Sequence, residues 1–406
     1  MAQPRAEPRI LAFPAARPAA GGPYVARLQL TDFRSYAGAI IETDSRPVVL
    51  SGPNGAGKTN LLEALSFLAP GRGLRRARLA EIDRRESGVT RQVARPWALA
   101  IRLGSPDGDG SGDCDIGTGR DAEDPARERR SLRIDGAPQR GQTGLAERVA
   151  LLWLTPQMDG LFLDSRSARR RFLDRLVLAF DPGHGTRLNA YEQATAERLR
   201  LLRGSFGNGE TGAWLSALEQ QIAEQAVAIA AARLDLVARL ARVLEAADGP
   251  FPRPALALAG EVESWLEEMP ALAAEERLRD CLLQNRGLDG EAGRALIGPH
   301  RTDLAARFAA SGMPAGDCST GEQKALIIAI LLGQARLMAE RPGRLPILLL
   351  DEIAAHLDES RRRALYEALL DLGVQAWLTG TERGLFEPFE ERAQYFTVAG
   401  GRIARN

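Results

Sequence analysis

The chain of 406 residues is poor in lysine, histidine and cysteine. Its three cysteines are odd in number and widely spaced, which excludes a disulfide framework or a zinc site and indicates a reducing compartment. Three histidines without ligand spacing leave only a magnesium site built from hydroxyl and carboxylate groups. Only Lys58 and Lys324 are lysine among the 53 basic residues, which 53 acidic residues balance. The zero net charge excludes a polybasic binder or an acidic chaperone.

Long apolar stretches are also missing. The longest nearly continuous apolar run covers residues 325–332, far short of the roughly 20 residues that a membrane span needs, so we expect no membrane partner. Residues 1–23 contain five prolines, and their only apolar stretch is too short for the core of a signal peptide. We predict a disordered extension there, with an organelle transit peptide as the alternative, and a cytoplasmic protein.

Apolar periodicity predicts a mixed α/β body interrupted by helices. Alternation over residues 25–30 and 97–103 is typical of half-buried strands, and Asp135-Gly136 marks a hairpin turn. The three-four spacing of residues 214–247 favours a long core helix over the alternative of an extended coiled coil. Residues 104–119 are rich in glycine and predict a flexible surface insertion. Further strands are predicted at residues 40–41, 48–50, 132–138, 305–308, 346–350 and 375–378, and further helices at residues 60–69, 165–179 and 186–203.

One segment has the spacing of a phosphate-binding loop. Gly52-Pro53-Asn54-Gly55-Ala56-Gly57-Lys58-Thr59 fits the pattern G-x-x-x-x-G-K-[ST] between a predicted strand and a predicted helix. Glycines let backbone N–H groups approach phosphate oxygens, and the helix directs its positive end at them. Lys58 would reach the β- and γ-phosphates, and Thr59 would coordinate Mg²⁺. The alternative is a glycine-rich turn that contains a lysine by chance.

A second segment ends a strand with two carboxylates. Residues 347–350 are continuously apolar, which suits a strand buried on both faces, and Asp351 and Glu352 follow directly. Asp351 would join the Mg²⁺ shell, and Glu352 would polarise a water molecule that attacks the γ-phosphate. The alternative is an ordinary strand followed by an acidic helix start.

A third segment opens an apolar helix. Cys318-Ser319-Thr320-Gly321-Glu322-Gln323-Lys324 places Ser319 or Thr320 as the helix cap and leaves N–H groups for a second anion site. By itself this is an ordinary cap. Its place between the phosphate loop and the acidic strand resembles the ATP-binding-cassette (ABC) superfamily. In that superfamily the signature loop binds the γ-phosphate held by the opposite subunit. The resemblance implies a head-to-tail homodimer with ATP at its interface.

Further motifs narrow the resemblance. Phe33-Arg34-Ser35-Tyr36 follows the first strand, as in the DNA-repair branch of the superfamily. Together with the segments that follow, in this order, it resembles the RecF family over residues 24–402. No long coiled coil intervenes, which separates the chain from SMC-type proteins. The other segments are Leu154-Thr155-Pro156-Gln157-Met158 (a Q-loop), Arg169-Arg170-Arg171-Phe172-Leu173-Asp174, Gly298-Pro299-His300-Arg301-Thr302-Asp303, and Asp351-Glu352 through Leu357-Asp358.

The resemblance implies an ABC-type P-loop ATPase head with an inserted, mainly helical lobe. Residues 24–160 and 295–406 would form the two parts of the ATPase lobe, residues 161–294 the insertion, and residues 1–23 the extension. The family binds duplex DNA at single-strand gaps and junctions and hydrolyses ATP slowly, with Mg²⁺ and stimulated by DNA. It acts with RecO and RecR to load RecA and to support the SOS response.

The same resemblance assigns roles to individual residues. Ser319, Thr320, Gly321 and Glu322 would address the partner's nucleotide in trans, Asp358 would lie in the loop that crosses the dimer interface, and Gln157 would serve the Q-loop. The chain departs from the superfamily in three places: Cys318 replaces the usual leucine, Thr320 the first glycine, and Thr379-Gly380-Thr381 the switch histidine of transporters. These departures predict slow hydrolysis.

Two arginine clusters are candidates for DNA contact. Neither contains many aromatic residues, so contact with the duplex backbone is favoured over stacking on single-stranded bases. The alternatives are a solvated face or pairing with carboxylates inside the molecule. The first cluster, which we favour, is Arg72, Arg75, Arg76, Arg78, Arg84 and Arg85, and the second is Arg166, Arg169, Arg170, Arg171 and Arg175.

Two other classes of protein share parts of this pattern. A transporter ATPase subunit would have a switch histidine and a Leu-Ser-Gly-Gly-Gln loop, and this sequence has neither. A structural clamp that uses ATP only to dimerise would not need Glu352. Lys324 directly follows the signature loop, and its presence in a chain with so little lysine predicts a specific role.

Overall fold

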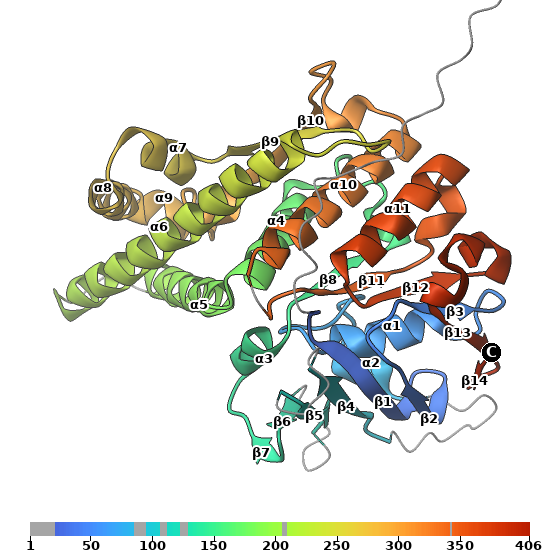
Figure 1. Ribbon diagram of the computed structural model, residues 1–406. Helices are drawn as coiled ribbons and strands as arrows, with labels where there is room; N and C mark the ends of the chain where they lie inside the picture. The colour runs from blue at the N-terminus through green and yellow to red at the C-terminus, as the bar shows by residue number, and fades with distance from the viewer. Residues whose placement is uncertain (1–20, 85–94, 106–111, 122–128, 205–208, 342) are drawn as a thin grey trace, which may run out of the picture. The chain divides into compact units, whose positions relative to one another are not determined.

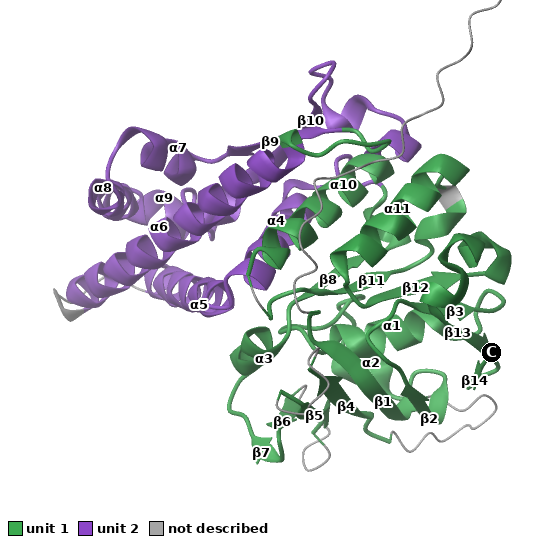
Figure 2. Cartoon of the chain, in the orientation of Figure 1, with its two compact units in different colours: residues 1–159, 245–252, 324–406 green, residues 160–244, 253–323 purple. Residues whose placement is uncertain are grey.

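The computed structural model describes residues 21–84, 95–105, 112–121, 129–204, 209–341 and 343–406 (Figure 1). The predicted extension falls almost wholly outside the described residues. The described chain divides into two compact units. Unit 1 comprises residues 1–159, 245–252 and 324–406, and unit 2 comprises residues 160–244 and 253–323 (Figure 2).

Unit 1 contains an antiparallel sheet with the strand order β2-β1-β4-β5-β6-β7. Alternate residues of β1 are buried, as the period-2 pattern of residues 25–30 predicts. Phe33, Phe67 and Trp97 pack as an aromatic cluster, with ring centroids 4.8–6.2 Å apart, and Phe67 directly follows helix α1 (Lys58–Ser66). The strands are β1 (Tyr24–Phe33), β2 (Tyr36–Glu42), β4 (Ala98–Gly104), β5 (Cys114–Arg120), β6 (Arg130–Ile134) and β7 (Ala137–Pro138).

A second sheet of unit 1 has the order β14-β13-β3-β12-β11-β8 and positions the predicted ATP site. All its neighbouring strands are parallel except β14, which pairs antiparallel with β13. β3 and β11 are buried at every residue, which explains their continuous apolar sequences. The strands are β3 (Val48–Ser51), β8 (Leu151–Leu154), β11 (Ile347–Leu350), β12 (Ala376–Gly380), β13 (Gln394–Ala399) and β14 (Arg402–Arg405).

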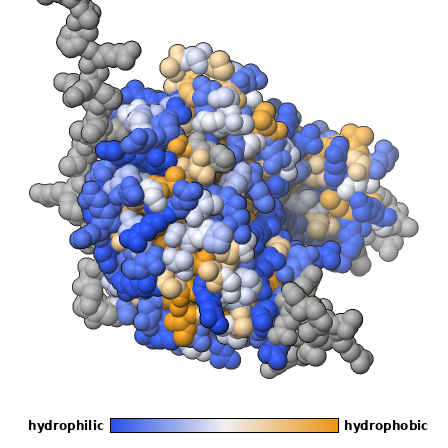
Figure 3. All heavy atoms as spheres, turned by 90° about the vertical axis from the view of Figure 1, so that its right-hand side faces the viewer, coloured by the Kyte–Doolittle hydropathy of each residue, from blue (hydrophilic) through white to orange (hydrophobic). Residues whose placement is uncertain are grey.

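One apolar core joins α1 to residues of both sheets. On the face seen in Figure 3, hydrophilic side chains predominate and apolar ones form small separate patches. The helical segments of unit 1 are α1 (Lys58–Ser66), α2 (Leu79–Ile82), α3 (Thr143–Arg148), η1 (Pro156–Met158), η4 (Ile353–His356), α11 (Glu359–Leu372) and η5 (Arg383–Arg392). Helix α10 (Thr320–Ala339) begins in unit 2 and continues in unit 1.

Unit 2 is mainly helical, as predicted. The predicted long helix is present as α6, and its buried apolar residues pack in a core with residues of α5, α7 and α8. The strands β9 and β10 form a small antiparallel sheet. The other elements are α4 (Arg166–Phe180), α5 (His184–Arg203), α6 (Gly209–Glu245), β9 (Pro254–Ala259), α7 (Glu261–Glu268), α8 (Ala271–Gln284), α9 (Arg286–Ala292), η2 (Pro299–Arg301), β10 (Asp303–Phe308) and η3 (Ala315–Asp317).

The structure differs from the sequence expectations in two places. Of the predicted flexible insertion over residues 104–119, residues 106–111 lie outside the described part of the chain. The second part of the prediction is wrong, because residues 114–120 form β5 and pair with both β4 and β6. This strand contains small and polar residues, so its sequence lacks a clear apolar alternation. It is held in the sheet by backbone hydrogen bonds to the strands on both sides. The structure also groups residues 295–323 with unit 2, since β10 pairs with β9, whereas the sequence placed them with the ATPase lobe.

A buried ion network holds the helices of unit 2 together. The guanidinium of Arg198 is fully buried and donates to Glu219 Oε1 (2.9 Å), Asp289 Oδ2 (2.6 Å) and the carbonyl of Leu282 (2.6 Å). Glu219 and Asp289 are buried as well, and Arg286 also pairs with Glu219 (2.6 Å), so two cations meet two carboxylates. Such a network contributes stability only while all its members are present.

Replacing Arg198 with methionine should therefore lower the free energy of unfolding by about 3–5 kcal/mol, because the buried Asp289 loses its cationic partner and Glu219 keeps only Arg286. Arg200→Met is the matched control, since Arg200 lies two residues away in an exposed ion pair with Glu197 and its loss should cost less than about 1 kcal/mol. Urea denaturation followed by circular dichroism measures both. Equal effects of the two variants would contradict the buried network.

Candidate ATP-binding site

The phosphate loop follows β3 and requires glycine at two positions. A Cβ atom on Gly52 would lie 2.1 Å from the carbonyl oxygen of Val398 on β13. Gly57 has φ 110°, and a Cβ there would lie 2.8 Å from the Tyr36 hydroxyl, which donates a hydrogen bond to the Gly57 carbonyl (3.1 Å). The motif glycines are therefore fixed by the packing of this loop as well as by its curvature.

Lys58 is the first residue of α1, and its ammonium group is held within the loop. Its Nζ donates to the carbonyls of Gly52 (2.7 Å) and Pro53 (3.0 Å). Burial lowers the pKa of Lys58, while the nearby carboxylates of Glu352 and Asp351 act to raise it. A compact cation thus lies among the loop carbonyls at the N-terminal end of a helix, where a phosphate binds best.

Asp351 meets two hydroxyl groups at the end of β11. Its Oδ1 accepts hydrogen bonds from Thr59 Oγ1 (3.0 Å) and Thr379 Oγ1 (2.8 Å). Burial, helped by the charge of Glu352, raises the pKa of Asp351, although both hydrogen bonds act in the opposite direction. A hydroxyl and a carboxylate in contact are the hard oxygen donors that Mg²⁺ prefers, so these residues fit the predicted ion.

Because the pKa of Asp351 is raised, the folded protein binds this proton more tightly than the unfolded chain does. Stability is lost as the pH rises from the ordinary value through the raised one, and the cost of the buried charge is fully present at neutral pH. Asp351→Asn keeps an acceptor for both threonines, so it should raise the free energy of unfolding at pH 7 and weaken binding of Mg²⁺-ATP. Urea titrations across acid and neutral pH measure the first effect.

Asp115→Asn is the control of opposite sign for this experiment. The hydrogen bond from Arg102 lowers the pKa of Asp115, so its charge stabilises the fold above the ordinary pKa and the contribution is lost in acid. This substitution should slightly lower stability at pH 7. A stability loss in Asp351→Asn at neutral pH would contradict the assignment.

Glu352 has an unusual backbone conformation for a glutamate. Its φ of 50° and ψ of 29° lie in the left-handed region, which costs a residue with a side chain about 1–3 kcal/mol. Its N–H donates to Thr379 Oγ1 (2.8 Å), the hydroxyl that also donates to Asp351. Thr379 is fully buried and thus fixes both acidic residues, a role that the sequence did not reveal.

A buried carboxylate in α1 organises the side chains next to the phosphate loop. Glu63 is fully buried and accepts two hydrogen bonds from Arg34 (2.6 and 2.9 Å) and one from Arg75 (3.0 Å). Arg75 also donates to Asn60 Oδ1 (2.8 Å), and Asn60 donates to Ser35 Oγ (2.9 Å). Arg75 was predicted as a DNA contact, but much of its charge is engaged inside the molecule.

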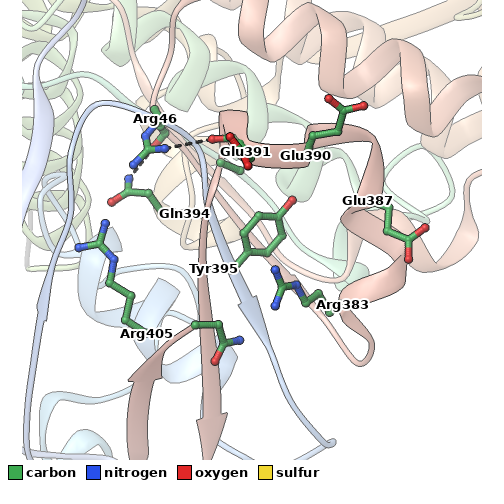
Figure 4. Close-up of a pocket in the computed structure, with 10 residues that line it drawn as sticks. Arg46, Arg383, Glu387, Glu390, Glu391, Gln394, Tyr395 and Arg405 are labelled. Carbon is green, nitrogen blue, oxygen red and sulfur yellow. Dashed lines mark hydrogen bonds between the residues drawn. The ribbon is translucent and has the colours of Figure 1, made fainter.

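This arrangement borders a hollow of about 510 Å³ close to the start of α1. A second hollow, of about 520 Å³, lies beside η5, β13 and β14 (Figure 4). There Arg383 lies over the ring of Tyr395, 4.6 Å from its centroid, and Arg46 donates to the Glu391 carbonyl (3.0 Å). The basic and acidic side chains that line this second hollow are equal in number, so the hollow offers no net positive charge for a phosphate group. The first hollow is lined by Arg34, Ser35, Asn60, Glu81 and Asp83.

The opposite end of α1 has a partner that sequence analysis missed. The guanidinium of Arg130 is buried and donates to the carbonyls of Phe67, Ala69 (3.3 Å) and Gly71 (3.4 Å), which follow the helix. It also lies over the Phe67 ring (4.9 Å). A cation at the C-terminal end of a helix complements its dipole, so Arg130 supports the helix whose other end carries the phosphate loop.

The signature segment begins α10 with a reciprocal cap. The backbone N–H of Ser319 donates to Glu322 Oε2 (2.9 Å), the Ser319 hydroxyl donates to the same oxygen (2.8 Å), and the Glu322 N–H donates back to Ser319 Oγ (3.4 Å). The predicted cap by Ser319 is confirmed. Thr320 is the first residue of the helix, and a Cβ on Gly321 would meet no atom within 4 Å.

Two other predicted site residues lie in unit 1. Gln157 is exposed in η1, directly after β8, and β8 pairs with β11 so that the Asp351 N–H donates to the carbonyl of Leu154 (2.9 Å). Asp358 caps α11 by accepting a hydrogen bond from the Arg361 N–H (2.8 Å). The structure thus brings the phosphate loop, Asp351, Glu352 and the Q-loop segment to the same edge of one sheet.

The second arginine cluster is largely structural. Arg169 pairs with Asp303 through two hydrogen bonds (2.7 and 2.8 Å), and Arg170 donates to the carbonyl of Thr302 (3.1 Å). Asp174 pairs with the buried Arg233 of α6 (2.9 and 3.0 Å). The two family segments over residues 169–174 and 298–303 therefore bind each other within unit 2, which favours the alternative of internal pairing for this cluster.

The fold and the site define an ABC-type P-loop ATPase. A family model described as an AAA domain matches residues 27–95. Among solved structures, the recombination mediator RecF with ATP matches with a TM-score of 0.79 at 19% identity, covering 96% of this chain and 99% of that one. The SMC head domain from Pyrococcus furiosus matches with a TM-score of 0.52 at 16% identity, covering 95% of this chain and 96% of that one.

Curated relatives identify the family. The DNA replication and repair protein RecF of Rhizobium rhizogenes is 47% identical over 94% of this chain and 99% of its own length. The RecF protein of Mesorhizobium japonicum is 48% identical over 94% of this chain and 97% of its own length. The chain belongs to the RecF family. Every helix in the described part of the chain is too short or too polar to span a lipid bilayer.

Proposed function

We propose that this protein is a cytoplasmic, ATP-dependent DNA-binding protein of recombinational repair and replication. It binds Mg²⁺-ATP, forms a head-to-tail homodimer around the nucleotide and binds duplex DNA at single-strand gaps and junctions. It works with RecR- and RecO-like partners to support RecA loading and the SOS response. The observation that carries the proposal is the contact of Asp351 with Thr59, beside Lys58 and Glu352.

Each site residue has a role in this proposal. The loop from Gly52 to Thr59 binds the phosphates, with Lys58 supplying the charge that the triphosphate requires. Thr59 and Asp351 hold Mg²⁺, which neutralises phosphate charge when bound. Glu352 polarises the attacking water as a general base. Gln157 serves the Q-loop, while Ser319, Thr320, Gly321, Glu322 and Asp358 act at the interface with the second protomer.

Two features argue for weak hydrolysis over the rival functions. Thr379 occupies the place of the transporters' switch histidine and is fully buried beneath the two acidic residues, so it makes a poor γ-phosphate sensor. A non-hydrolysing structural clamp is the second candidate, since the Ser319 hydroxyl is occupied by its own cap. The strained backbone conformation of Glu352 suggests a functional constraint on this carboxylate. A role as general base would explain that constraint and favours hydrolysis over the clamp.

The test is sedimentation of the full chain with and without Mg²⁺-ATP and gapped duplex DNA, together with an assay of phosphate release. We expect ATP to produce a dimer, and DNA to increase both dimerisation and turnover. Absence of any effect of ATP on mass and of any effect of DNA would overturn the proposed function. A dimer without measurable phosphate release would support the clamp instead.

For DNA contact we expect exposed members of the first arginine cluster to act on the duplex backbone. Arg72 and Arg78 are exposed, and unlike Arg75 they do not contact the buried Glu63. Reversing both charges (Arg72→Glu with Arg78→Glu) should weaken duplex binding at least about tenfold and reduce the salt slope of log K by about 2. Fluorescence anisotropy across salt concentrations measures this. Arg140→Glu, another exposed charge reversal, is the control, and an unchanged slope in the double variant would refute the contact.

A further inference from the structure

The second lysine of the chain lies where the polypeptide passes between the two units. The chain leaves unit 1 after Asp159, passes through it again at residues 245–252, and returns to it for the last time at Lys324. These two residues form an ion pair, with Lys324 Nζ 3.2 Å from Asp159 Oδ2. Two points of the chain separated by 164 residues are thus joined by a side-chain contact at the border of unit 1.

Lys324 is buried and Asp159 is partly buried, but the pair is incompletely satisfied. The side chain of Lys324 is 2% exposed, and Asp159 Oδ1 is buried with no hydrogen-bond partner among the described residues. Arg198, in contrast, makes three contacts of 2.9 Å or shorter. Burying the Lys324 ammonium beside a carboxylate with an unpaired buried oxygen costs stability, so this contact adds little to the stability of the fold. The pair therefore points to a role other than stability.

Each member of the pair is attached to a different part of the ATP machinery. Asp159 directly follows η1, which holds Gln157, and the preceding strand β8 pairs with β11 in the register that opposes Leu154 and Leu350. Lys324 lies in the second turn of α10, five residues after the cap residue Ser319. Next to it, Gln323 donates to the carbonyl of Cys318 (2.9 Å) and so fixes the signature segment to the same helix.

We propose that the Lys324–Asp159 pair is a positioning contact that couples the Q-loop segment to the signature helix. It holds η1 and α10 in one arrangement, so that ATP bound at the phosphate loop presents the signature segment correctly to a second protomer. The inference rests on the proposed ATP-dependent dimer. It assigns Lys324 no contact with nucleotide, and it makes the ion pair a determinant of dimerisation rather than of ATP affinity.

This role predicts that substitutions of the pair weaken dimerisation much more than they weaken nucleotide binding. Lys324→Met and Asp159→Asn should each weaken dimerisation in the presence of ATPγS about tenfold, within the ordinary range of coupling between sites. Binding of a fluorescent ATP analogue to the dilute monomer should change less than about twofold, because the phosphate loop is untouched. Lys324→Arg retains the charge and should recover much of the loss, although its larger head must fit a buried position.

The double variant distinguishes a pair from two independent residues. If the contact carries the effect, Lys324→Met with Asp159→Asn should dimerise no worse than either single variant. Additive losses would overturn the proposal, as would equal losses in nucleotide affinity and dimerisation. Asp159→Asn is isosteric and keeps the test valid if the lysine variant folds poorly, which thermal unfolding reports.

The controls separate this inference from the proposed function. Arg102→Met removes an exposed ion pair with Asp115 in unit 1 and should change neither measurement. If the wild-type protein does not dimerise with ATPγS, the proposed function fails. If the wild-type dimerises and both single variants match it, the proposed function stands and the coupling role of the pair is wrong.

Discussion

Lys58→Arg should lower ATP hydrolysis by at least about 100-fold, which corresponds to about 2.7 kcal/mol of lost transition-state stabilisation. Lys58 is 4% exposed, and its Nζ lies 2.7 Å and 3.0 Å from two carbonyl oxygens of the phosphate loop. A planar guanidinium is wider than an ammonium and cannot occupy this space without opening the loop. ATP affinity should fall as well, since the loop and the triphosphate share the same cation.

Phosphate release under saturating Mg²⁺-ATP, with affinity measured by a fluorescent analogue, gives both quantities. Arg102→Lys makes the reverse exchange at an exposed ion pair and should leave both unchanged. The comparison matters because arginine replaces lysine almost everywhere in this chain. A Lys58→Arg variant that kept half of the wild-type rate would show that only the positive charge is needed at this position. The inference that the loop excludes a guanidinium would then be wrong.

Glu352→Gln should lower hydrolysis by about 100-fold or more while ATP binding persists, because glutamine cannot accept the proton of the attacking water. The substitution preserves the side-chain length and the backbone N–H that donates to Thr379. Since ATP would be bound but not cleaved, the nucleotide-bound dimer should accumulate and dissociate slowly.

Single-turnover phosphate release and dimer lifetime after dilution measure these two effects. Glu382→Gln, an exposed change in the same unit, is the control. An unchanged rate in Glu352→Gln would remove this residue from the hydrolysis step. A wild-type protein with no turnover and a dimer as long-lived as that of the variant would favour the structural clamp.

The parts of the site that are contiguous in sequence were predictable. The spacing of Gly52 to Thr59 and the apolar run before Asp351 each combine a local conformation with a chemical group, and the structure brings Thr59 and Asp351 into contact. The helical character of residues 165–203 and 214–247 was predictable for the same reason, since periodicity is a local property.

Contacts set by strand order could not be predicted in this way. Thr379 meets Asp351 because β12 lies between β3 and β11, an order that no local pattern records. Glu63 lies in a predicted helix, where a glutamate is ordinary, so nothing in the sequence pointed to its role. In the structure it is buried and pairs with Arg34 and Arg75. Charge clusters counted along the sequence likewise overstate the free charge, as the pairing of Arg169 with Asp303 demonstrates.

The position of β3 has a consequence for biosynthesis. β3 ends at Ser51, but its two neighbours, β12 and β13, begin at Ala376 and Gln394. At about 5–20 residues per second, a ribosome takes on the order of tens of seconds to make the intervening chain. During that interval the nascent polypeptide carries an apolar strand with both edges unpaired, while all of unit 2 is completed. The segment that leads into the phosphate loop is thus made early and acquires its neighbours last.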